Sequence, residues 1–309
     1  MLKILRHAAA PAPTAIAIGS FDGVHLGHQA MLAHVCAAAK ARGLASAALT
    51  FEPLPREFFA PREAPARLSS LAEKLAAIEA TGIGIAWVQR FERRFAALTA
   101  EGFERRLHDH HGARWVMVGQ DFRYGAGRKG DSASLAAAGR ALGFEVAVLP
   151  PVSIDGVRVS STRVRDALAA GHLEAAQRLL GRAYAICGRV VHGKKRGRLM
   201  GFPTANVRLA RARPALQGVF AVKCFGAATR GLEGVASLGI NPAVEVDGPA
   251  SLEAFLFDFS GGLYGRRVTI EFVKKLRDEA HFASLDELRA RIGRDCDEAR
   301  EFFRASATR

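Results

Sequence analysis

Residues 19–28 decide how the first half of the chain folds, and they read Gly19-Ser20-Phe21-Asp22-Gly23-Val24-His25-Leu26-Gly27-His28. An apolar run at 14–18 precedes them and a helical pattern at 26–39 follows, which predicts a buried strand, a turn bounded by glycines and a helix. His25 and His28 are three positions apart, so both can face the same side of the first helical turn. Unpaired backbone N–H groups and the positive end of the helix dipole attract phosphate there. We therefore expect an anion-binding site with two titratable side chains, at which Gly19, Gly23 and Gly27 let the backbone approach a ligand.

The composition indicates a basic chain with an anionic partner. It holds 44 Lys and Arg against 30 Asp and Glu, a net charge of +14, which leaves nucleic acid, membrane headgroups and small polyphosphates as partner classes. The apolar runs are shorter than the roughly 20 residues of a membrane span, and the first residues lack the continuous apolar core of a signal peptide. The distant cysteines form no Cys-x-x-Cys pair, which is typical of reduced thiols in a cytoplasmic protein.

Apolar strands alternate with helices through the first half, which predicts an α/β domain with a parallel sheet covered on both faces. The strands are expected at 14–18, 44–51, 83–88, 114–118 and 144–149, and the helices at 26–39, 70–80, 99–110 and 132–142. Ligands of such sheets bind at the carboxyl ends of the strands. Three polar segments fall there, at 20–28, 52–56 and 119–124. A fourth segment, Ser160-Ser161-Thr162-Arg163-Val164-Arg165, opens a helix with hydroxyls and a guanidinium that can face phosphate.

Two patterns in the first half suggest other chemistry. Gly125-Ala126-Gly127-Arg128-Lys129-Gly130 matches the dinucleotide-binding motif, but that motif must follow a strand directly, and residues 119–124 intervene. His108, His110 and His111 resemble a metal cluster, although polar residues at the end of a helix beside Gly112 explain them without a metal. We therefore expect neither a nicotinamide-dependent dehydrogenase nor a histidine metal site.

The second half has a different character from about residue 181 onward. Short runs rich in β-branched and aromatic residues, separated by glycine-rich turns, predict strands at 185–191, 218–225, 232–238, 251–259 and 267–273. No long helix lies between them, so we expect an antiparallel β-barrel. A capping box at 284–287 starts a terminal helix whose apolar stripe, which includes Cys296, packs on the barrel. The expected domains are residues 1–183 and residues 184–309.

Chemistry in the second half is expected at two places. After the basic run 192–198, Thr204 and Asn206 offer neutral oxygens two residues apart, suited to Mg²⁺ that substrate phosphates also hold, although ordinary turn capping explains them equally well. Glu253 lies on an otherwise apolar strand and shares a face with Phe255 and Phe257 by alternation. It either prevents pairing of this strand with another chain or acts as a general base beside a cavity.

Together these motifs resemble the bifunctional bacterial riboflavin kinase/FMN adenylyltransferase family, also called FAD synthetase. The first half shares the segment at 19–28, which is the family's form of the His-x-x-His motif of nucleotidylyltransferases. It also shares Val118-Gly119-x-Asp121-Phe122-Arg123-Tyr124-Gly125 and Ser160-Ser161-Thr162-x-x-Arg165. The second half shares Gly201-Phe202-Pro203-Thr204-Ala205-Asn206 and Leu252-Glu253, followed by Asp258-Phe259 and Leu263-Tyr264-Gly265.

The resemblance implies a Rossmann-like nucleotidylyltransferase domain followed by a barrel of the riboflavin kinase type, and it assigns a role to each motif. The barrel would phosphorylate riboflavin with ATP, with Glu253 as base and Mg²⁺ on Thr204 and Asn206. The first domain would join FMN and ATP into FAD and pyrophosphate, with His25, His28 and Arg165 as catalytic residues. The ATP and phosphate contacts would come from Gly19, Phe21, Asp22, Gly23, Gly27, Ser161, Thr162, Gly193, Lys194 and Gly201. The flavin contacts would come from Asp121, Phe122, Arg123 and Arg277.

Four residues depart from the family pattern: Leu54 and Phe255 stand where His is usual, Ala243 stands where Thr is common, and Met200 replaces the usual Leu, which conserves volume. One alternative is therefore a single-activity nucleotidylyltransferase whose barrel only binds flavin or a partner. A basic RNA-binding protein is a second alternative, but the loop at 192–198 lacks an adjacent aromatic-rich stacking strand. We expect a cytoplasmic enzyme with small-molecule partners, no nucleic-acid partner and no membrane partner; a homo-oligomer is compatible with the sequence.

Overall fold

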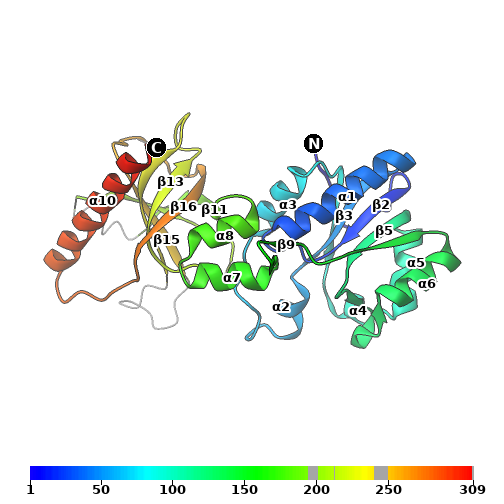
Figure 1. The fold of residues 1–309 in the computed structure, drawn as a ribbon. Helices are drawn as coiled ribbons and strands as arrows, with labels where there is room; N and C mark the ends of the chain where they lie inside the picture. The colour runs from blue at the N-terminus through cyan, green and yellow to red at the C-terminus, as the bar shows by residue number, and fades with distance from the viewer. Residues whose placement is uncertain (194–200, 212, 240–249, 308–309) are drawn as a thin grey trace. The chain divides into compact units, whose positions relative to one another are not determined.

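The computed structural model describes residues 1–193, 201–211, 213–239 and 250–307, and the chain divides into two compact units (Figure 1). The first unit comprises residues 1–65 and 71–160, and the second comprises residues 66–70 and 161–309. The expected domain boundary at residue 183 falls within the second unit, after the helices α7 (Ser161–Ala169) and α8 (Leu173–Leu180).

A six-stranded parallel sheet forms the centre of the first unit, with the strand order β1-β4-β3-β2-β5-β8. Its strands are β1 (Lys3–Leu5), β2 (Thr14–Ile18), β3 (Ala45–Glu52), β4 (Ile85–Arg90), β5 (Ala113–Gly119) and β8 (Glu145–Leu149). The five strands expected from the sequence are confirmed. The short edge strand β1, which pairs with β4, was not expected.

Helices cover both faces of this sheet, as expected for an α/β domain. The main helices are α1 (Leu26–Arg42), α3 (Leu71–Glu79), α5 (Ala100–Asp109) and α6 (Ser132–Leu142). Alternate side chains of β2 enter two separate cores. Ile16 and Ile18 pack with residues of α5 and α6, whereas Ala15 and Ala17 pack with residues of α1 and α3. Because both faces are buried, every residue of β2 is buried, which explains its continuous apolar run.

Short elements connect the strands of the first unit. They are the helices α2 (Pro55–Phe59) and α4 (Arg93–Ala96), the pair β6 (Arg123–Tyr124) and β7 (Gly130–Asp131) around the 3₁₀ turn η1 (Ala126–Arg128), and the hairpin β9 (Ser153–Ile154) and β10 (Val157–Arg158). The pattern at 125–130 therefore joins β6 to β7 before α6, and it does not follow a strand of the main sheet.

A closed six-stranded antiparallel barrel forms most of the second unit, with the order β11-β12-β15-β14-β13-β16. Its strands are β11 (Ala185–Val191), β12 (Thr204–Val207), β13 (Gly218–Phe225), β14 (Leu232–Gly239), β15 (Ser251–Leu256) and β16 (Arg267–Arg277). The expected antiparallel barrel is confirmed, but the expectation of five strands was wrong. Residues 204–207 form the missing strand, which pairs with both β11 and β15 and so closes the barrel.

Successive side chains of the barrel strands point to opposite faces, so the strands separate two cores. Leu252, Ala254 and Leu256 of β15 belong to the core inside the barrel, which also contains apolar residues of α7 and α8. Val219 and Ala221 of β13 lie on the outer face and pack with the terminal helix α10 (Leu285–Ala307). The stripe expected on this helix is confirmed, and Cys296 is buried in it. Within the described residues, no helix is long and apolar enough to cross a bilayer.

Candidate active sites

The turn at 19–28 leads from β2 into α1 with an unusual backbone. Phe21, Gly23 and Val24 have φ angles of 48°, 81° and 41°, so all three lie in the left-handed region. This region is rare for a β-branched residue such as Val24, and strain of this kind gathers at functional sites. Phe21 and Val24 are fully buried against α1, which holds the turn in this conformation.

The two histidines of the turn lie against each other at the start of α1. His25 is the N-cap residue, and its Nδ1 accepts a hydrogen bond from the backbone N–H of His28 at 3.3 Å. The two rings stack with centroids 3.7 Å apart and planes 14° apart. The expectation that both residues face one side of the first turn is confirmed. Because Nδ1 of His25 accepts this bond, a proton on the ring lies on Nε2, the ring nitrogen that can donate.

The electrostatic surroundings keep His28 neutral. Burial, the charge of His25 and the charge of Lys74 all lower the pKa of His28 well below its ordinary value. Its Nδ1 is buried and has no hydrogen-bond partner within the described residues. A buried polar atom without a partner is costly, and this one lies where phosphate binding is expected.

The other polar segments of the first unit follow strands next to β2 in the sheet. Residues 52–56 follow β3, and residues 119–124 follow β5, so all three segments lie at the carboxyl edge, as expected. Asp121 pairs with Arg158 at 2.5 Å, and Arg123 pairs with Asp131 at 3.0 Å. The ring of Phe122 stacks on Tyr124 with centroids 5.5 Å apart. Leu54 is buried at the start of α2.

Ser161, Thr162 and Arg165 begin α7, as expected. The guanidinium of Arg165 donates from Nε to the backbone oxygen of Ala66 at 2.5 Å. These residues belong to the second unit, whereas His25 and His28 belong to the first. Their union in one site therefore stays a prediction.

Strand pairing places the expected kinase residues in one row on the outer face of the barrel. Asn206 of β12 is the register partner of Glu253 on β15, and Glu253 is in turn the partner of Ser237 on β14. Register partners share a face of the sheet. Thr204 donates from its hydroxyl to Oε2 of Glu253 at 3.2 Å. This polar row, defined as Asn206, Glu253 and Ser237, lies beside the apolar cover that α10 gives to the same face.

Ser237 and Glu279 are polar residues of this region that were not expected from the sequence. The hydroxyl of Ser237 donates to Oε1 of Glu279 at 2.5 Å. Ser237 lies on a mainly apolar strand, and Glu279 follows the end of β16, so neither stands out in the sequence. Only the register of β14 against β15 brings Ser237 beside Glu253.

The glycines expected near the kinase phosphates differ in their surroundings. A Cβ on Gly193 would lie 2.3–2.5 Å from the side-chain amide of Asn206, so a larger residue there would displace that amide. A Cβ on Gly201 would meet nothing within 4 Å, although the φ of this residue is +88°. Lys194, Met200 and Ala243 lie outside the described residues. Phe255 packs edge-to-face on Phe202 at 5.4 Å.

Arg277, expected to contact flavin, is bound to the terminal helix. Its Nε donates to both carboxylate oxygens of Asp295 at 3.0 Å, and its Nη2 donates to Oδ2 at 2.8 Å. Arg291 donates to the same carboxylate, which is 2% exposed. The guanidinium of Arg277 therefore fixes α10 to the end of β16.

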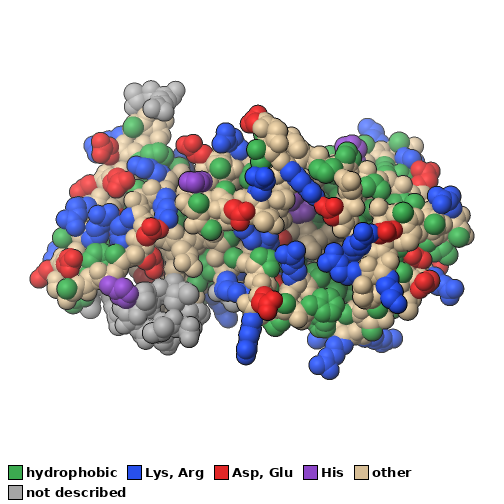
Figure 2. All heavy atoms as spheres, turned by 60° about the horizontal axis from the view of Figure 1, so that its bottom comes forward, with side chains coloured by type: hydrophobic (Ala, Val, Ile, Leu, Met, Phe, Trp, Pro, Cys, Tyr) green, Lys and Arg blue, Asp and Glu red, His purple; other side chains and the backbone are tan. Residues whose placement is uncertain are grey.

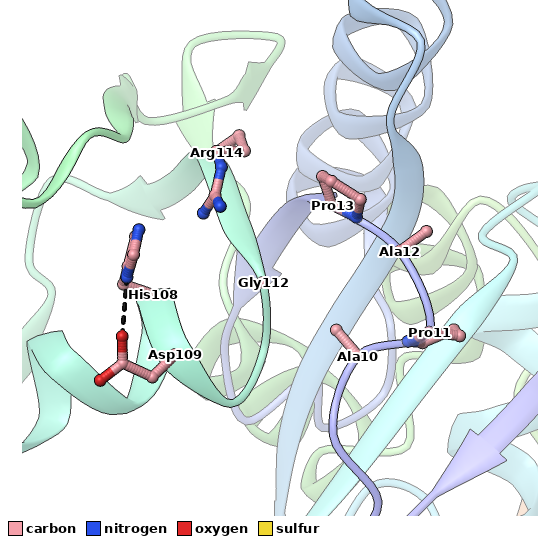
Figure 3. A pocket seen from close by; sticks show the side chains of 8 residues that line it. All are labelled: Ala10, Pro11, Ala12, Pro13, His108, Asp109, Gly112 and Arg114. Atoms are coloured by element: carbon pink, nitrogen blue, oxygen red, sulfur yellow. Dashed lines mark hydrogen bonds and ion pairs between the residues drawn. The ribbon is translucent and has the colours of Figure 1, made fainter.

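A pocket of about 440 Å³ lies at the opposite, amino-terminal edge of the parallel sheet (Figure 3). It is lined by Ala10, Pro11, Ala12, Pro13, His108, Asp109, Gly112 and Arg114. Its polar groups include His108 and Asp109, which pair with each other at 2.8 Å. Ligands of parallel sheets bind at the opposite, carboxyl edge, where the segments 20–28, 52–56 and 119–124 lie.

The neighbouring histidine His111 is almost fully buried in apolar surroundings. Its ring meets Trp87 edge-to-face at 4.9 Å, and neither ring nitrogen has a hydrogen-bond partner within the described residues. Burial and the charges of His110 and Arg106 lower the pKa of His111 to about 3. Among the described residues, no group of His, Cys, Asp and Glu side chains could hold a metal ion.

The basic charge of the chain is spread out on the face that Figure 2 shows. Lys and Arg side chains are distributed over this face with Asp and Glu side chains among them. Basic side chains form ion pairs in both units, such as Arg123 with Asp131 and Lys274 with Glu298. A continuous basic stripe, the usual footprint of nucleic-acid binding, is absent from this view of the described residues.

Comparisons with known proteins agree with the motifs. A family described as FAD synthetase matches residues 7–163, and one described as riboflavin kinase matches residues 180–303. The bifunctional riboflavin kinase/FMN adenylyltransferase of Escherichia coli (strain K12) is 45% identical over 308 residues, which are 98% of each chain. The enzyme of that name from Pseudomonas fluorescens is 46% identical over 94% of each chain. A crystal structure described as a macrolide-efflux protein from Streptococcus pneumoniae superposes with a TM-score of 0.80, at 29% identity over 94% of this chain and 97% of the other. This chain therefore belongs to the family of bifunctional riboflavin kinase/FMN adenylyltransferases.

Proposed function

We propose that the chain phosphorylates riboflavin with ATP at the polar row of the barrel and adenylylates FMN with a second ATP at the carboxyl edge of the parallel sheet. The single observation that carries this proposal is that each of the two family-matched parts of the chain has its own cluster of polar side chains. One is the stacked histidine pair of α1, and the other is the row around Glu253.

For riboflavin phosphorylation, we assign the role of general base to Glu253. Its carboxylate accepts a hydrogen bond from the hydroxyl of Thr204, which orients it, and the register places Glu253 between Asn206 and Ser237 on the same face of the sheet. A carboxylate held in this way can take the proton of the riboflavin 5′-hydroxyl as that oxygen attacks the γ-phosphate. Gly193 leaves the backbone close to Asn206, where phosphate oxygens need N–H donors.

The oxygens of Thr204 and Asn206 fit a magnesium ion. A hydroxyl and a side-chain amide are hard, neutral donors, and Mg²⁺ usually takes one or two protein ligands together with substrate phosphates and water. Bound there, Mg²⁺ would offset the negative charge of the ATP phosphates. The hydrogen bond of Thr204 to Glu253 would keep the ligand residue and the base in fixed relation.

For FMN adenylylation, the enzyme needs no nucleophile of its own, because the phosphate of FMN attacks the α-phosphorus of ATP and pyrophosphate leaves. The protein then contributes positioning and stabilisation of the charge on the phosphate oxygens. We propose that His25 donates from Nε2 and that His28 offers its buried, unpartnered Nδ1 side to the phosphates. Ser161 and Arg165 would bind the leaving pyrophosphate.

Two variants of the purified full chain test these assignments. His28→Ala should abolish the conversion of FMN into FAD and leave the phosphorylation of riboflavin near normal, and Glu253→Ala should do the reverse. Product analysis after incubation with riboflavin and Mg-ATP measures both reactions in one sample. If either change stops both reactions in a folded protein, the assignment of two separate sites is wrong.

We also propose that the enzyme works in the cytoplasm and that its two catalytic domains comprise residues 1–183 and 184–309. The four cysteines are free, and two of them are buried, which suits a reducing compartment. The family matches end at 163 and begin again at 180, so α7 and α8 lie near the junction.

A further inference from the structure

One lysine of the first unit lies in its core. Lys74 of α3 is 0% exposed, as is Ile78 one helical turn further along the same face. Lysine is almost never fully buried unless its charge is paired or used, because removing an ammonium from water is costly. An amphipathic helix would place an apolar residue at this position.

The ammonium of Lys74 is held at the carboxyl end of β3. Its Nζ donates to the hydroxyl of Thr50 at 3.2 Å and lies 3.5 Å from the backbone oxygen of Phe51. Thr50, which is also fully buried, donates its hydroxyl to the backbone oxygen of Ser20 at 3.1 Å. A chain of hydrogen bonds therefore runs from α3 through β3 into the turn at 19–28.

The same ammonium acts on the histidine pair. The charge of Lys74, together with burial and the charge of His25, disfavours protonation of His28. Two carboxylate residues are close in sequence to the residues of this hydrogen-bond chain: Asp22 follows Ser20 by two positions, and Glu52 follows Phe51 directly. The charged or titratable groups in or next to the turn and its hydrogen-bond partners are His25, His28, Lys74, Asp22 and Glu52.

We propose that Lys74 is a positioning residue for FMN adenylylation, which fixes the turn at 19–28 through its hydrogen bond to Thr50. The inference rests on the proposed role of this turn in FMN adenylylation. In the free enzyme the buried charge keeps the imidazole neutral, so His28 meets ATP as a hydrogen-bonding group.

Substitution of Lys74 separates its two effects. Lys74→Met keeps the length of the side chain and removes both the donor and the charge, whereas Lys74→Gln keeps a donor and removes only the charge. Lys40→Met, which removes an exposed lysine from the last turn of α1, is the matched control. All measurements use the full chain, and riboflavin phosphorylation serves as an internal control.

We expect Lys74→Met to lower kcat for FMN adenylylation about 10- to 100-fold, the range for loss of a hydrogen bond to a charged group. Riboflavin phosphorylation should stay within about twofold. Loss of the neighbouring charge favours the protonated imidazole, so the apparent pKa in the pH profile of adenylylation should move upward in both Lys74 variants. Lys74→Gln should have a higher adenylylation rate than Lys74→Met but the same shifted pH profile. Lys40→Met should change neither the rate nor the pH profile of adenylylation.

Two results would overturn the inference. One is an adenylylation rate and pH profile that Lys74→Met or Lys74→Gln leaves unchanged. The other is loss of native tryptophan emission in both Lys74 variants, which would make the lysine merely structural; Trp87 and Trp115 report on the first unit. Failure of the proposed site itself would look different, because His28→Ala would then retain FMN adenylylation.

Discussion

Replacing His111 with leucine should stabilise the first unit, and increasingly so as the pH falls. The two ring nitrogens of His111 are buried and have no hydrogen-bond partner within the described residues, and the residue is 2% exposed. Leucine has a similar volume and needs no partner. Removal of a buried unsatisfied polar group is worth about 1–3 kcal/mol, which sets the gain expected at pH 8 for His111→Leu.

The pH dependence follows from the direction of the shift. The pKa of His111 is about 3 in the folded protein, whereas an unfolded histidine has a pKa of about 6.5. Between these values the unfolded state binds more protons, so the stability of the wild type rises with pH and is lost as the pH falls through this window. Protonation of the unfolded state costs the wild type about 0.8 kcal/mol at pH 6 and about 2 kcal/mol at pH 5, and His111→Leu escapes this cost.

Tryptophan emission during urea unfolding measures this effect in the first unit alone. Both tryptophans, Trp87 and Trp115, lie in the first unit and are buried. The difference in unfolding free energy between His111→Leu and the wild type should therefore grow by about 2 kcal/mol between pH 8 and pH 5. A difference that is independent of pH, or a variant less stable than the wild type at pH 8, would refute the assignment of a neutral, unsatisfied His111.

Three further predictions concern the second unit. Asp295→Ala leaves two arginines beside a vacated carboxylate site, so the unfolding free energy measured by loss of riboflavin phosphorylation in urea should fall by about 3–5 kcal/mol; a fall below about 1 kcal/mol would contradict the buried ion pair. Gly193→Ala should lower the rate of riboflavin phosphorylation at least about tenfold, because the new Cβ clashes with the side-chain amide of Asn206. Gly262→Ala is the control, since its Cβ meets nothing within 4 Å, and it should leave the rate unchanged. The fragment 161–309, which keeps α7 and α8, should have a higher melting temperature than the fragment 184–309, because residues of both helices belong to the barrel core. Thermal unfolding monitored by circular dichroism measures this difference, and equal melting temperatures would disprove the prediction.

The parallel sheet could be predicted from the sequence because its signals are local. A strand buried on both faces reads as a continuous apolar run, as β2 does at Thr14–Ile18, and a helix cap such as Thr99, whose hydroxyl accepts from the N–H of Gly102, is visible within four residues. Because all strands of such a sheet run in the same direction, their carboxyl ends lie at one edge. The histidine pair could be predicted for the same reason, since His25 and His28 are neighbours on one helical turn.

The barrel site could be predicted only in part, because it depends on the register between distant strands. β12 has four residues and follows Pro203, so its pattern is too short to distinguish a strand from a turn. Thr204 and Asn206 were nevertheless expected as magnesium ligands on the family motif. Ser237 could not be expected, because nothing near it in the sequence indicates that β14 pairs with β15 at Glu253.

Lys74 shows a different limit of sequence reading. Its spacing from Leu71 and Ile78 places it on the apolar face of α3, so the sequence contains the sign that this lysine is buried. The same spacing is compatible with a lysine whose long stem covers apolar surface while its ammonium reaches water. What decides between them is Thr50, twenty-four residues earlier on the neighbouring strand, whose hydroxyl accepts from Nζ and donates to Ser20. The position of a buried charge is thus interpretable only when the strand end that it contacts is known, and here that strand end contacts Ser20 of the turn at 19–28.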